Sequence, residues 1–146
     1  MGNLNTKEIG NLTELQCMTR FYELGCSISI PFGNSDKYDL IMNINDKLYK
    51  VQIKHSSEYL DDLGDIAYIK FKCTWQSHNI YGYARTQYKE NEIDFFATFY
   101  NGKCYLVPQK ECSNEKRLRI KPPKNGQKSR VSFLEDYVAE KVISNM

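Results

Sequence analysis

Residues 38–54, YDLIMNINDKLYKVQIK, contain the pattern that decides the fold of this chain. Two strand-like runs, 38–44 and 47–54, flank the pair Asn45-Asp46. Asparagine and aspartate tolerate the left-handed backbone that a tight two-residue turn requires. The stretch therefore predicts an antiparallel β-hairpin.

The register of this hairpin gathers polar side chains on one face. A hairpin centred on the turn places Asp39 opposite Gln52, and directly opposed residues project to the same side of a sheet. Because side chains alternate along a strand, Lys54 joins Gln52 on that face, while Val51 and Ile53 point into a core. A carboxylate, an amide and an ammonium group therefore converge.

This convergence has two interpretations. An Asp–Lys pair on a solvent-facing sheet is common and contributes under about 1 kcal/mol. Desolvating Asp39 and Lys54 without good partners would instead cost several kcal/mol, which favours a functional role if the sheet is covered. Neighbouring apolar side chains suggest that both faces are at least partly covered; they are Leu40, Ile41, Met42, Ile44, Val51 and Ile53.

The residue types suit a metal-dependent phosphodiester site. Mg²⁺ prefers oxygen ligands, which the Asp39 carboxylate, the Gln52 amide oxygen and the Ile53 backbone carbonyl would provide. Lys54 would orient the attacking water and offset charge on the phosphate. A second acid is needed, and Glu14 is the best candidate, although it is equally compatible with an ordinary exposed helix position.

The remaining chain predicts an α/β architecture with a mixed central sheet flanked by helices. Residues 6–24 read as a helix with Asn5 and Glu8, or Thr6, at its cap and Gly25 after its end. Further strands are expected at 26–30, at 65–75 and as a hairpin, 93–100 with 103–107. Residues 60–64 read as a turn and residues 76–91 as a short helix or an active-site loop.

Taken together, these residues resemble the PD-(D/E)XK nuclease superfamily, which includes restriction enzymes, junction resolvases and some homing endonucleases. The resemblance covers residues 10–55 well and residues 65–107 loosely. It implies a restriction-endonuclease-like α-β-β-β-α-β core and Mg²⁺-dependent cleavage of double-stranded DNA, with Mn²⁺ able to substitute. It assigns catalysis to Glu14, Asp39, Gln52 and Lys54, and metal binding to Asp39, Glu14, Gln52 and Ile53.

Two positions depart from the family pattern. Tyr38-Asp39 replaces Pro-Asp, and Gln52 replaces the usual acid, which removes a metal-binding charge. Glutamine at this position is similar to a subset that includes intron-encoded homing endonucleases. Alternatives remain open: a Holliday-junction resolvase, a catalytically inactive DNA-binding relative, or a small-molecule-binding regulatory domain.

Net charge is +2, but residues 116–130, KRLRIKPPKNGQKSR, hold seven Lys/Arg and no acid. Such a segment indicates either a polyanionic partner or a solvated linker. We expect it to be extended and to contact DNA phosphates, with Arg85 and Gln87 as readers of base edges. The DNA-contacting set from the segment is Lys116, Arg117, Arg119, Lys121, Lys124, Lys128 and Arg130.

We therefore expect three parts: a nuclease core at 1–115, a basic DNA-contacting segment at 116–131 and a C-terminal helix at 132–146. Ser132 and Glu135 form a capping box for this helix, which would dock on the core or on another subunit. Because one site cuts one strand, a double-strand cutter requires a homodimer or homotetramer.

Composition sets the remaining bounds. The 146 residues are 41% hydrophobic and 26% charged, which is typical of one globular domain. No apolar run approaches a membrane span, and the first residues lack a signal peptide pattern. Five irregularly spaced cysteines without a CxxC pair are typical of free thiols in a reducing cytoplasm and do not fit a zinc site. We expect a cytoplasmic protein of a prokaryote or phage.

Overall fold

A computed structural model describes residues 2–33 and 35–146. Helix α1 spans Thr6–Glu23 and begins with the expected capping box, in which Asn5 accepts from the Glu8 N–H at 2.9 Å. The helix ends before Gly25, whose φ of 86° is accessible to glycine at little cost. The predicted helix at 6–24 is confirmed.

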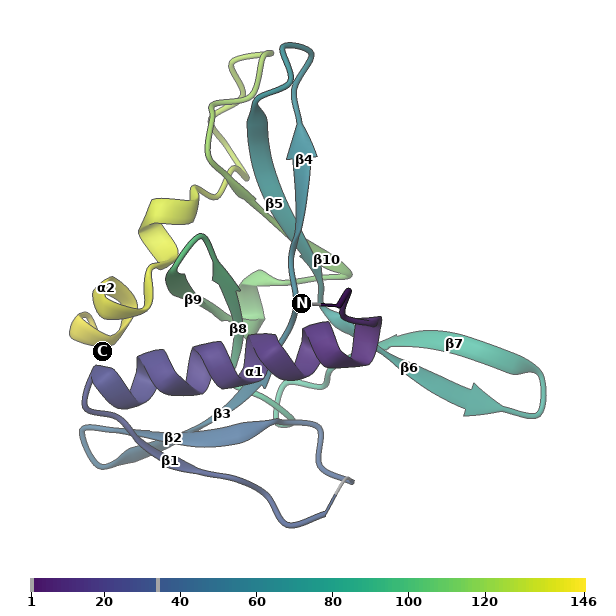
Figure 1. The fold of residues 1–146 in the computed structure, drawn as a ribbon, viewed down its shortest axis with the longest axis vertical. Coiled ribbons are helices and arrows are strands. Elements are labelled where there is room, and N and C mark those ends of the chain that lie inside the picture. Colours follow the sequence, from purple (N-terminus) through teal and green to yellow (C-terminus); the bar gives the residue numbers. More distant parts are fainter. Residues whose placement is uncertain (1, 34) are drawn as a thin grey trace.

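The central sheet has five strands in the order β1-β2-β3-β8-β9. Their bounds are β1 Ser27–Ser29, β2 Leu40–Ile44, β3 Lys47–Ile53, β8 Phe95–Tyr100 and β9 Lys103–Pro108. Strands β3 and β8 run parallel and all the other neighbours run antiparallel, so the sheet is mixed. Figure 1 shows α1 lying along this sheet. The predicted α/β class, with a mixed central sheet and flanking helices, is confirmed.

The β2–β3 hairpin has the register that the sequence predicts. Leu40 pairs with Val51 and Ile44 pairs with Lys47. The turn residues Asn45 and Asp46 have φ values of 51° and 65°, as a tight hairpin with the right-handed twist requires. The backbone N–H of Asp39 continues the ladder by donating to the Val51 carbonyl at 2.9 Å.

Hydrophobic cores lie on both faces of the central sheet. The first core packs α1 against the sheet, and its members include Cys17, Phe21, Leu40, Met42, Val51, Ile53, Ala97 and Leu106. The second core packs the opposite face against the second sheet, with Ile69, Phe71, Tyr88, Ile93, Phe96, Val107 and Leu118. Both faces of the central sheet are therefore covered, but the second face of β3 is covered only in part, because Gln52 is half-buried there and Leu48 is 66% exposed.

A second, three-stranded sheet has the order β10-β5-β4, with β4 Ser57–Leu60, β5 Ile66–Lys72 and β10 Glu115–Arg119. Strand β4 was not predicted, and the predicted strand at 65–75 stops at Lys72, because the chain turns into a separate hairpin at Thr74. The predicted basic segment enters this sheet, since Leu118 is buried within it. The boundary expected at 116 thus falls inside β10.

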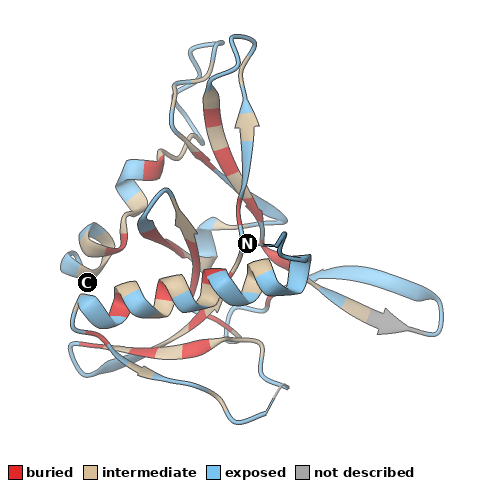
Figure 2. Ribbon diagram, in the orientation of Figure 1, coloured by how far each residue is buried: buried red, intermediate tan, exposed pale blue. Residues whose placement is uncertain are grey.

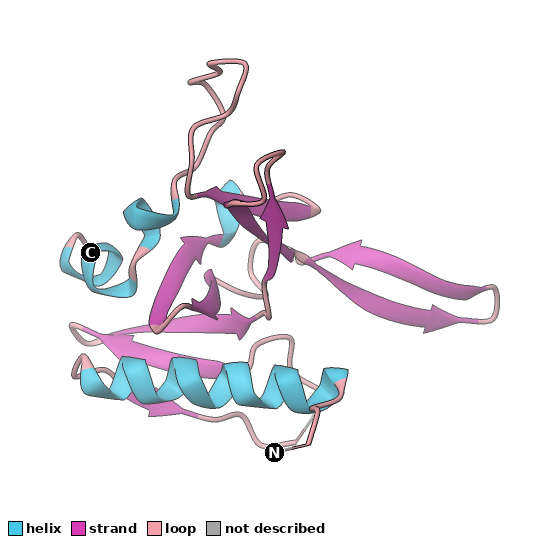
Figure 3. Ribbon diagram, turned by 45° about the horizontal axis from the view of Figure 1, so that its top comes forward, coloured by secondary structure: helices cyan, strands magenta, loops and turns pink. Residues whose placement is uncertain are grey.

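The expectation of a helix or loop at 76–91 is wrong. A two-stranded hairpin, β6 Thr74–Asn79 and β7 Gly82–Gln87, projects from the body (Figures 1 and 3). Figure 2 shows that β7 is exposed along its whole length. A strand that is exposed to solvent on both faces has no alternation of apolar and polar residues, so the sequence pattern does not predict it.

The single helix expected from Ser132 is also wrong. Residues Leu134–Tyr137 form a 3-10 turn, η2, and α2 spans only Ala139–Ser144; a further 3-10 turn, η1, spans Gln109–Glu111. Between η2 and α2, Val138 is extended and forms a β-bridge with Tyr105, which outweighs the local capping signal. The segment packs on the body, where Ala139 is buried in the first core.

No helix in the described residues is both long and apolar enough for a membrane crossing.

Candidate active site

Asp39 lies directly before β2 and is fixed by backbone contacts to β3. Its Oδ2 accepts a hydrogen bond from the Ile53 N–H at 2.7 Å, and its own N–H bonds to Val51. The carboxylate therefore takes the place of a backbone carbonyl as the hydrogen-bond acceptor at the end of the β2–β3 pair. This contact orients the carboxylate through the backbone of β3.

Glu14 approaches Asp39 from α1. The same helix buries Thr13 and Cys17 against the sheet, which directs the half-buried Glu14 side chain toward the start of β2. Burial, a side-chain hydrogen bond to Asp39 and the charge of Asp39 raise the pKa of Glu14 to about 7. The two acids that the sequence nominated therefore meet in the fold.

Lys54 follows β3 and is held in place at both ends. Its N–H donates to the Ala97 carbonyl at 2.8 Å, and its Nζ donates to the Thr74 carbonyl at 3.0 Å. Burial lowers the pKa of Lys54, the nearby Arg85 lowers it further, and Asp39 opposes both effects. The buried Tyr88 ring lies 5.3 Å from the same Nζ.

Gln52 is half-buried and pairs with Phe96 across the parallel β3–β8 ladder. Alternation along β3 puts Gln52 on the same side as Lys54, opposite to Val51 and Ile53, which belong to the first core. Ile53 itself contributes its backbone to this region through the Asp39 contact. The described residues contain no group of three or more His, Cys, Asp or Glu side chains that could hold a metal ion.

Arg85 lies on β7 and makes two contacts to Thr74 on β6. Its Nε donates to Thr74 Oγ1 at 3.0 Å and its Nη2 to the Thr74 carbonyl at 3.1 Å. The guanidinium therefore shares the carbonyl that holds Lys54, at the base of the β6–β7 hairpin. Gln87 donates to Asn114 Oδ1 at 2.8 Å on the exposed side of this hairpin.

Sequence reasoning missed Thr74 and Tyr88, which both touch Lys54. Thr74 contributes a backbone carbonyl, which any residue type supplies, so its side chain carried no signal. Tyr88 lies in residues 76–91, for which the sequence favours a short helix or an active-site loop, and it is buried in the second core. Its alignment with the site depends on how the hairpin returns to the body, which local sequence does not encode.

The seven cations of 116–130 do not form one continuous charged surface. Lys121 pairs with Asp61 and Asp65, and Lys124 pairs with Asp62. Lys116 contacts the Glu111 carbonyl, at 3.3 Å, and lies over the Tyr137 ring. The others, Arg117, Arg119, Lys128 and Arg130, lie on β10 or on the loop that follows it.

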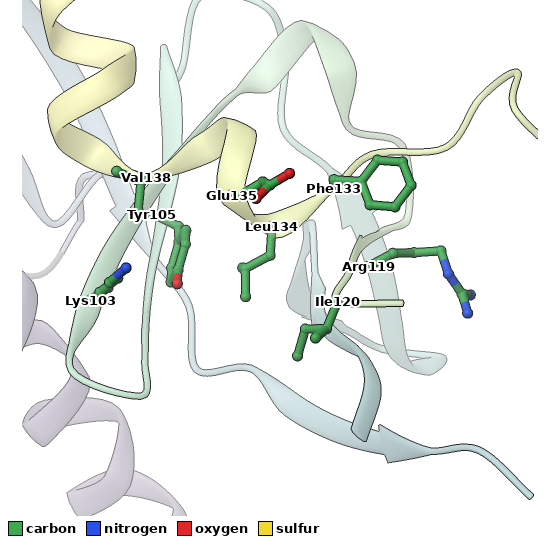
Figure 4. Close-up of a pocket in the computed structure, with 8 residues that line it drawn as sticks. All are labelled: Lys103, Tyr105, Arg119, Ile120, Phe133, Leu134, Glu135 and Val138. Atoms are coloured by element: carbon green, nitrogen blue, oxygen red, sulfur yellow. The ribbon is translucent and has the colours of Figure 1, made fainter. Parts of the chain in front are cut away.

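A cavity of about 320 Å³ opens elsewhere, between β9, the end of β10 and the C-terminal segment (Figure 4). Leu134 and Ile120 point into it, whereas the Arg119 guanidinium points away from both. None of the four predicted catalytic residues lines this cavity. The candidate site is therefore the end of the β2–β3 hairpin, where acids from two elements meet beside a half-buried lysine.

An α/β fold with a mixed sheet, paired acids and a lysine at a hairpin end defines the restriction-endonuclease-like nucleases. Residues 4–140 match the family model described as PD-(D/E)XK endonuclease. Because this match spans most of the chain, the protein belongs to the PD-(D/E)XK endonuclease family and is a hydrolytic nuclease. Nucleases of this family generally use divalent metal ions.

A solved structure supports the same fold. The chain is similar to a bacterial homing endonuclease, I-Ssp6803I, with a TM-score of 0.73 and 21% sequence identity. The similarity covers 97% of this chain and 95% of that chain. A search of curated protein sequences found no match.

Proposed function

We propose that this nuclease is a Mg²⁺-dependent endonuclease that hydrolyses phosphodiester bonds in double-stranded DNA, in the manner of homing or restriction enzymes. The observation that carries the proposal is the contact between the Glu14 and Asp39 carboxyl groups next to Lys54. Two acids from different elements meet there beside a cation, at the end of a rigid hairpin.

The donor chemistry fits a divalent cation. Burial is the main cause of the raised pKa of Glu14, and the hydrogen bond to Asp39 and the charge of Asp39 raise it further, since two ionised carboxyl groups at this distance repel one another. A hard cation relieves it, and the oxygen set of Asp39, Glu14, the Gln52 amide and the Ile53 carbonyl would hold Mg²⁺, or Mn²⁺ in its place. Such an ion supplies positive charge against the scissile phosphate and makes a water molecule more acidic.

The chain's own residues carry the remaining tasks. The Ile53 N–H fixes Asp39, so the acid needs no reorganisation when substrate arrives. Lys54, held by the Thr74 carbonyl, would place its ammonium beside the attacking water and the phosphate. Gln52 would contribute a neutral amide where most relatives carry an acid, so two carboxylates would supply all of the ligand charge.

DNA would lie across this end of the molecule. Arg85 at the base of β6–β7 would face the phosphate near Lys54, and the exposed β7, including Gln87, would follow the DNA groove. Cutting both strands would require two copies with two-fold symmetry, which favours a homodimer or a homotetramer.

Cleavage assays test the proposal. Supercoiled plasmid should be linearised in Mg²⁺, and Asp39→Ala should abolish this while Glu23→Gln, an exposed acid on the same helix as Glu14, should not. Cutting that survives in Asp39→Ala would refute the assigned site. Four-way junctions in a parallel arm address the resolvase alternative, which preferential cutting of junctions would favour. DNA binding without cutting in Mg²⁺ or Mn²⁺ would identify an inactive relative.

A further inference from the structure

Three arginines line one pocket outside the candidate active site. Arg117 and Arg119 come from β10, and Arg130 comes from the loop that follows. The cavity measures about 310 Å³, and no carboxylate lines it. Its remaining walls are formed by Pro123, Asn125, Gln127, Val131 and Ser132, of which three carry side-chain hydrogen-bond donors.

Two of the guanidinium groups are held in place by one aromatic ring. The Cζ atoms of Arg117 and Arg119 lie 5.0 Å and 5.2 Å from the centre of the Tyr68 ring. Tyr68 in turn stacks on Tyr59, with ring centres 5.0 Å apart. Cation–π contacts of this kind position an arginine and leave its in-plane N–H groups free to donate. The Arg119 Nε already donates to the Lys121 carbonyl at 2.7 Å, which leaves the terminal N–H groups of Arg119 for a partner.

The loop is folded so that the third arginine returns to the same place. Lys121 and Lys124 fasten the start of the loop to the β4–β5 turn through its aspartates. At the other end, the Arg119 N–H donates to the Ser132 carbonyl at 2.8 Å. Arg130 has a φ of 60°, a left-handed conformation that non-glycine residues rarely adopt and that the surrounding contacts must hold.

The acids nearest to this pocket are already engaged. Glu115 lies 3.2 Å from Lys70 and 3.8 Å from Arg117, so its shorter contact is to the lysine. The aspartates of the β4–β5 turn pair with Lys121 and Lys124. Positive charge therefore accumulates where Arg117, Arg119 and Arg130 meet.

We propose that this pocket binds a single backbone phosphate of the DNA and so sets the position of the duplex relative to the active site. The inference rests on the proposed function. Three guanidinium groups around one concavity favour a phosphate oxyanion, which they contact with paired N–H donors. Because the pocket lies on the second sheet, away from Asp39 and Lys54, it contributes to binding and not to the chemical step.

The salt dependence of DNA binding tests the proposal. Each phosphate contact contributes about 0.9 to the slope of log K against log salt. Arg130→Gln should weaken binding about tenfold at low salt and lower that slope measurably, but by less than the roughly 0.9 of a whole phosphate, because Arg117 and Arg119 remain. Lys141→Gln is the matched control: Lys141 lies on α2 outside the pocket, carries the same charge and pairs with Asp136 at 3.1 Å, so the slope should stay at the wild-type value.

The triple variant Arg117→Gln/Arg119→Gln/Arg130→Gln distinguishes a pocket that holds one phosphate from a surface on which each arginine contacts a different phosphate. One shared phosphate predicts a total slope loss of about 0.9, whereas three separate phosphates predict about 2.7. A loss near the larger value would overturn the single-phosphate pocket, and so would an unchanged slope in Arg130→Gln. Circular dichroism establishes that each variant is folded, and Arg130→Gln alone suffices if the triple variant is not.

Two further experiments distinguish a DNA phosphate site from a site for a free anion and from failure of the proposed function. Phosphate ethylation interference on bound DNA should weaken at one position in Arg130→Gln and at none in Lys141→Gln. Inorganic phosphate, titrated without DNA, should bind only at millimolar concentrations; micromolar binding would assign the pocket to a free anion and overturn the DNA assignment. If wild-type protein binds no DNA at all, the proposed function fails; normal binding with an unchanged Arg130→Gln slope refutes only this pocket.

Discussion

Lys54 Nζ donates a hydrogen bond of 3.0 Å to the backbone carbonyl of Thr74, the residue at which the β6–β7 hairpin leaves the body. The same carbonyl accepts from Arg85 Nη2 at 3.1 Å. Because one oxygen serves both cations, the projecting hairpin and the candidate catalytic lysine are joined at a single atom. The orientation of the arm and the position of Lys54 are thereby linked.

Arg85→Ala should slow cleavage by about 10-fold to 10²-fold, because it removes a positive charge next to Lys54 and one hairpin contact at Thr74. The Lys54 ammonium should also gain basicity, since Arg85 contributes to the lowering of its pKa. Single-turnover cleavage at saturating enzyme measures the first effect. Arg85→Lys, which keeps the charge, should recover part of the rate; equal rates for both variants would contradict the electrostatic explanation.

Lys54→Ala should reduce the single-turnover rate by about 10²–10³ while leaving DNA affinity in Ca²⁺ within about twofold of wild type. The reason is that Lys54 is half-buried at the end of β3 and has its ammonium next to the acids, not on the broad surface that would hold the duplex. Lys50→Ala, on the same strand, serves as the control. A parallel loss of affinity and rate would assign Lys54 to substrate binding instead.

The sequence predicts the β2–β3 hairpin and its register because one face is apolar and the turn residues accept positive φ. It also names Glu14 as the best candidate for a second acid, and the fold brings Glu14 to Asp39. It does not predict the β6–β7 arm, in which exposure on both sides removes the periodic signal. The contact between Lys54 and Thr74 stays hidden for the same reason, because tertiary placement of the arm decides it.

The pairing of Lys121 and Lys124 with the β4–β5 turn was also beyond sequence reasoning. These residues lie about sixty positions from their aspartate partners along the chain. A count of charges treats all seven cations alike, whereas the fold uses some for ion pairs and directs three arginines into one pocket. Long-range pairing thus determines which charges remain for a ligand.

Phe21→Ala should destabilise the protein by about 3–5 kcal/mol, because the ring is fully buried between α1 and the central sheet. Urea unfolding followed by circular dichroism measures the change. The adjacent Tyr22 is 76% exposed, so Tyr22→Ala should cost well under 1 kcal/mol. Similar losses for both variants would show that α1 is not anchored through Phe21. Since α1 carries Glu14, cleavage by Phe21→Ala should also fail at lower temperatures than wild type.

Glu14→Gln should abolish cleavage and yet stabilise the metal-free protein above neutral pH. The pKa of Glu14 is raised from 4.5 to about 7, so folding favours its protonated form. The stability gained from that protonation is complete below pH 4.5 and is lost as the pH rises through about 7. Thermal melts in EDTA should therefore show wild-type stability falling between these pH values relative to Glu14→Gln, which has no such titration.

Adding Mg²⁺ at pH 8 should raise the wild-type melting temperature and leave that of Glu14→Gln nearly unchanged, because the ion would neutralise the paired acids. Wild type and Glu14→Gln with the same pH profile in EDTA would mean that the two carboxyl groups do not interact as the fold places them.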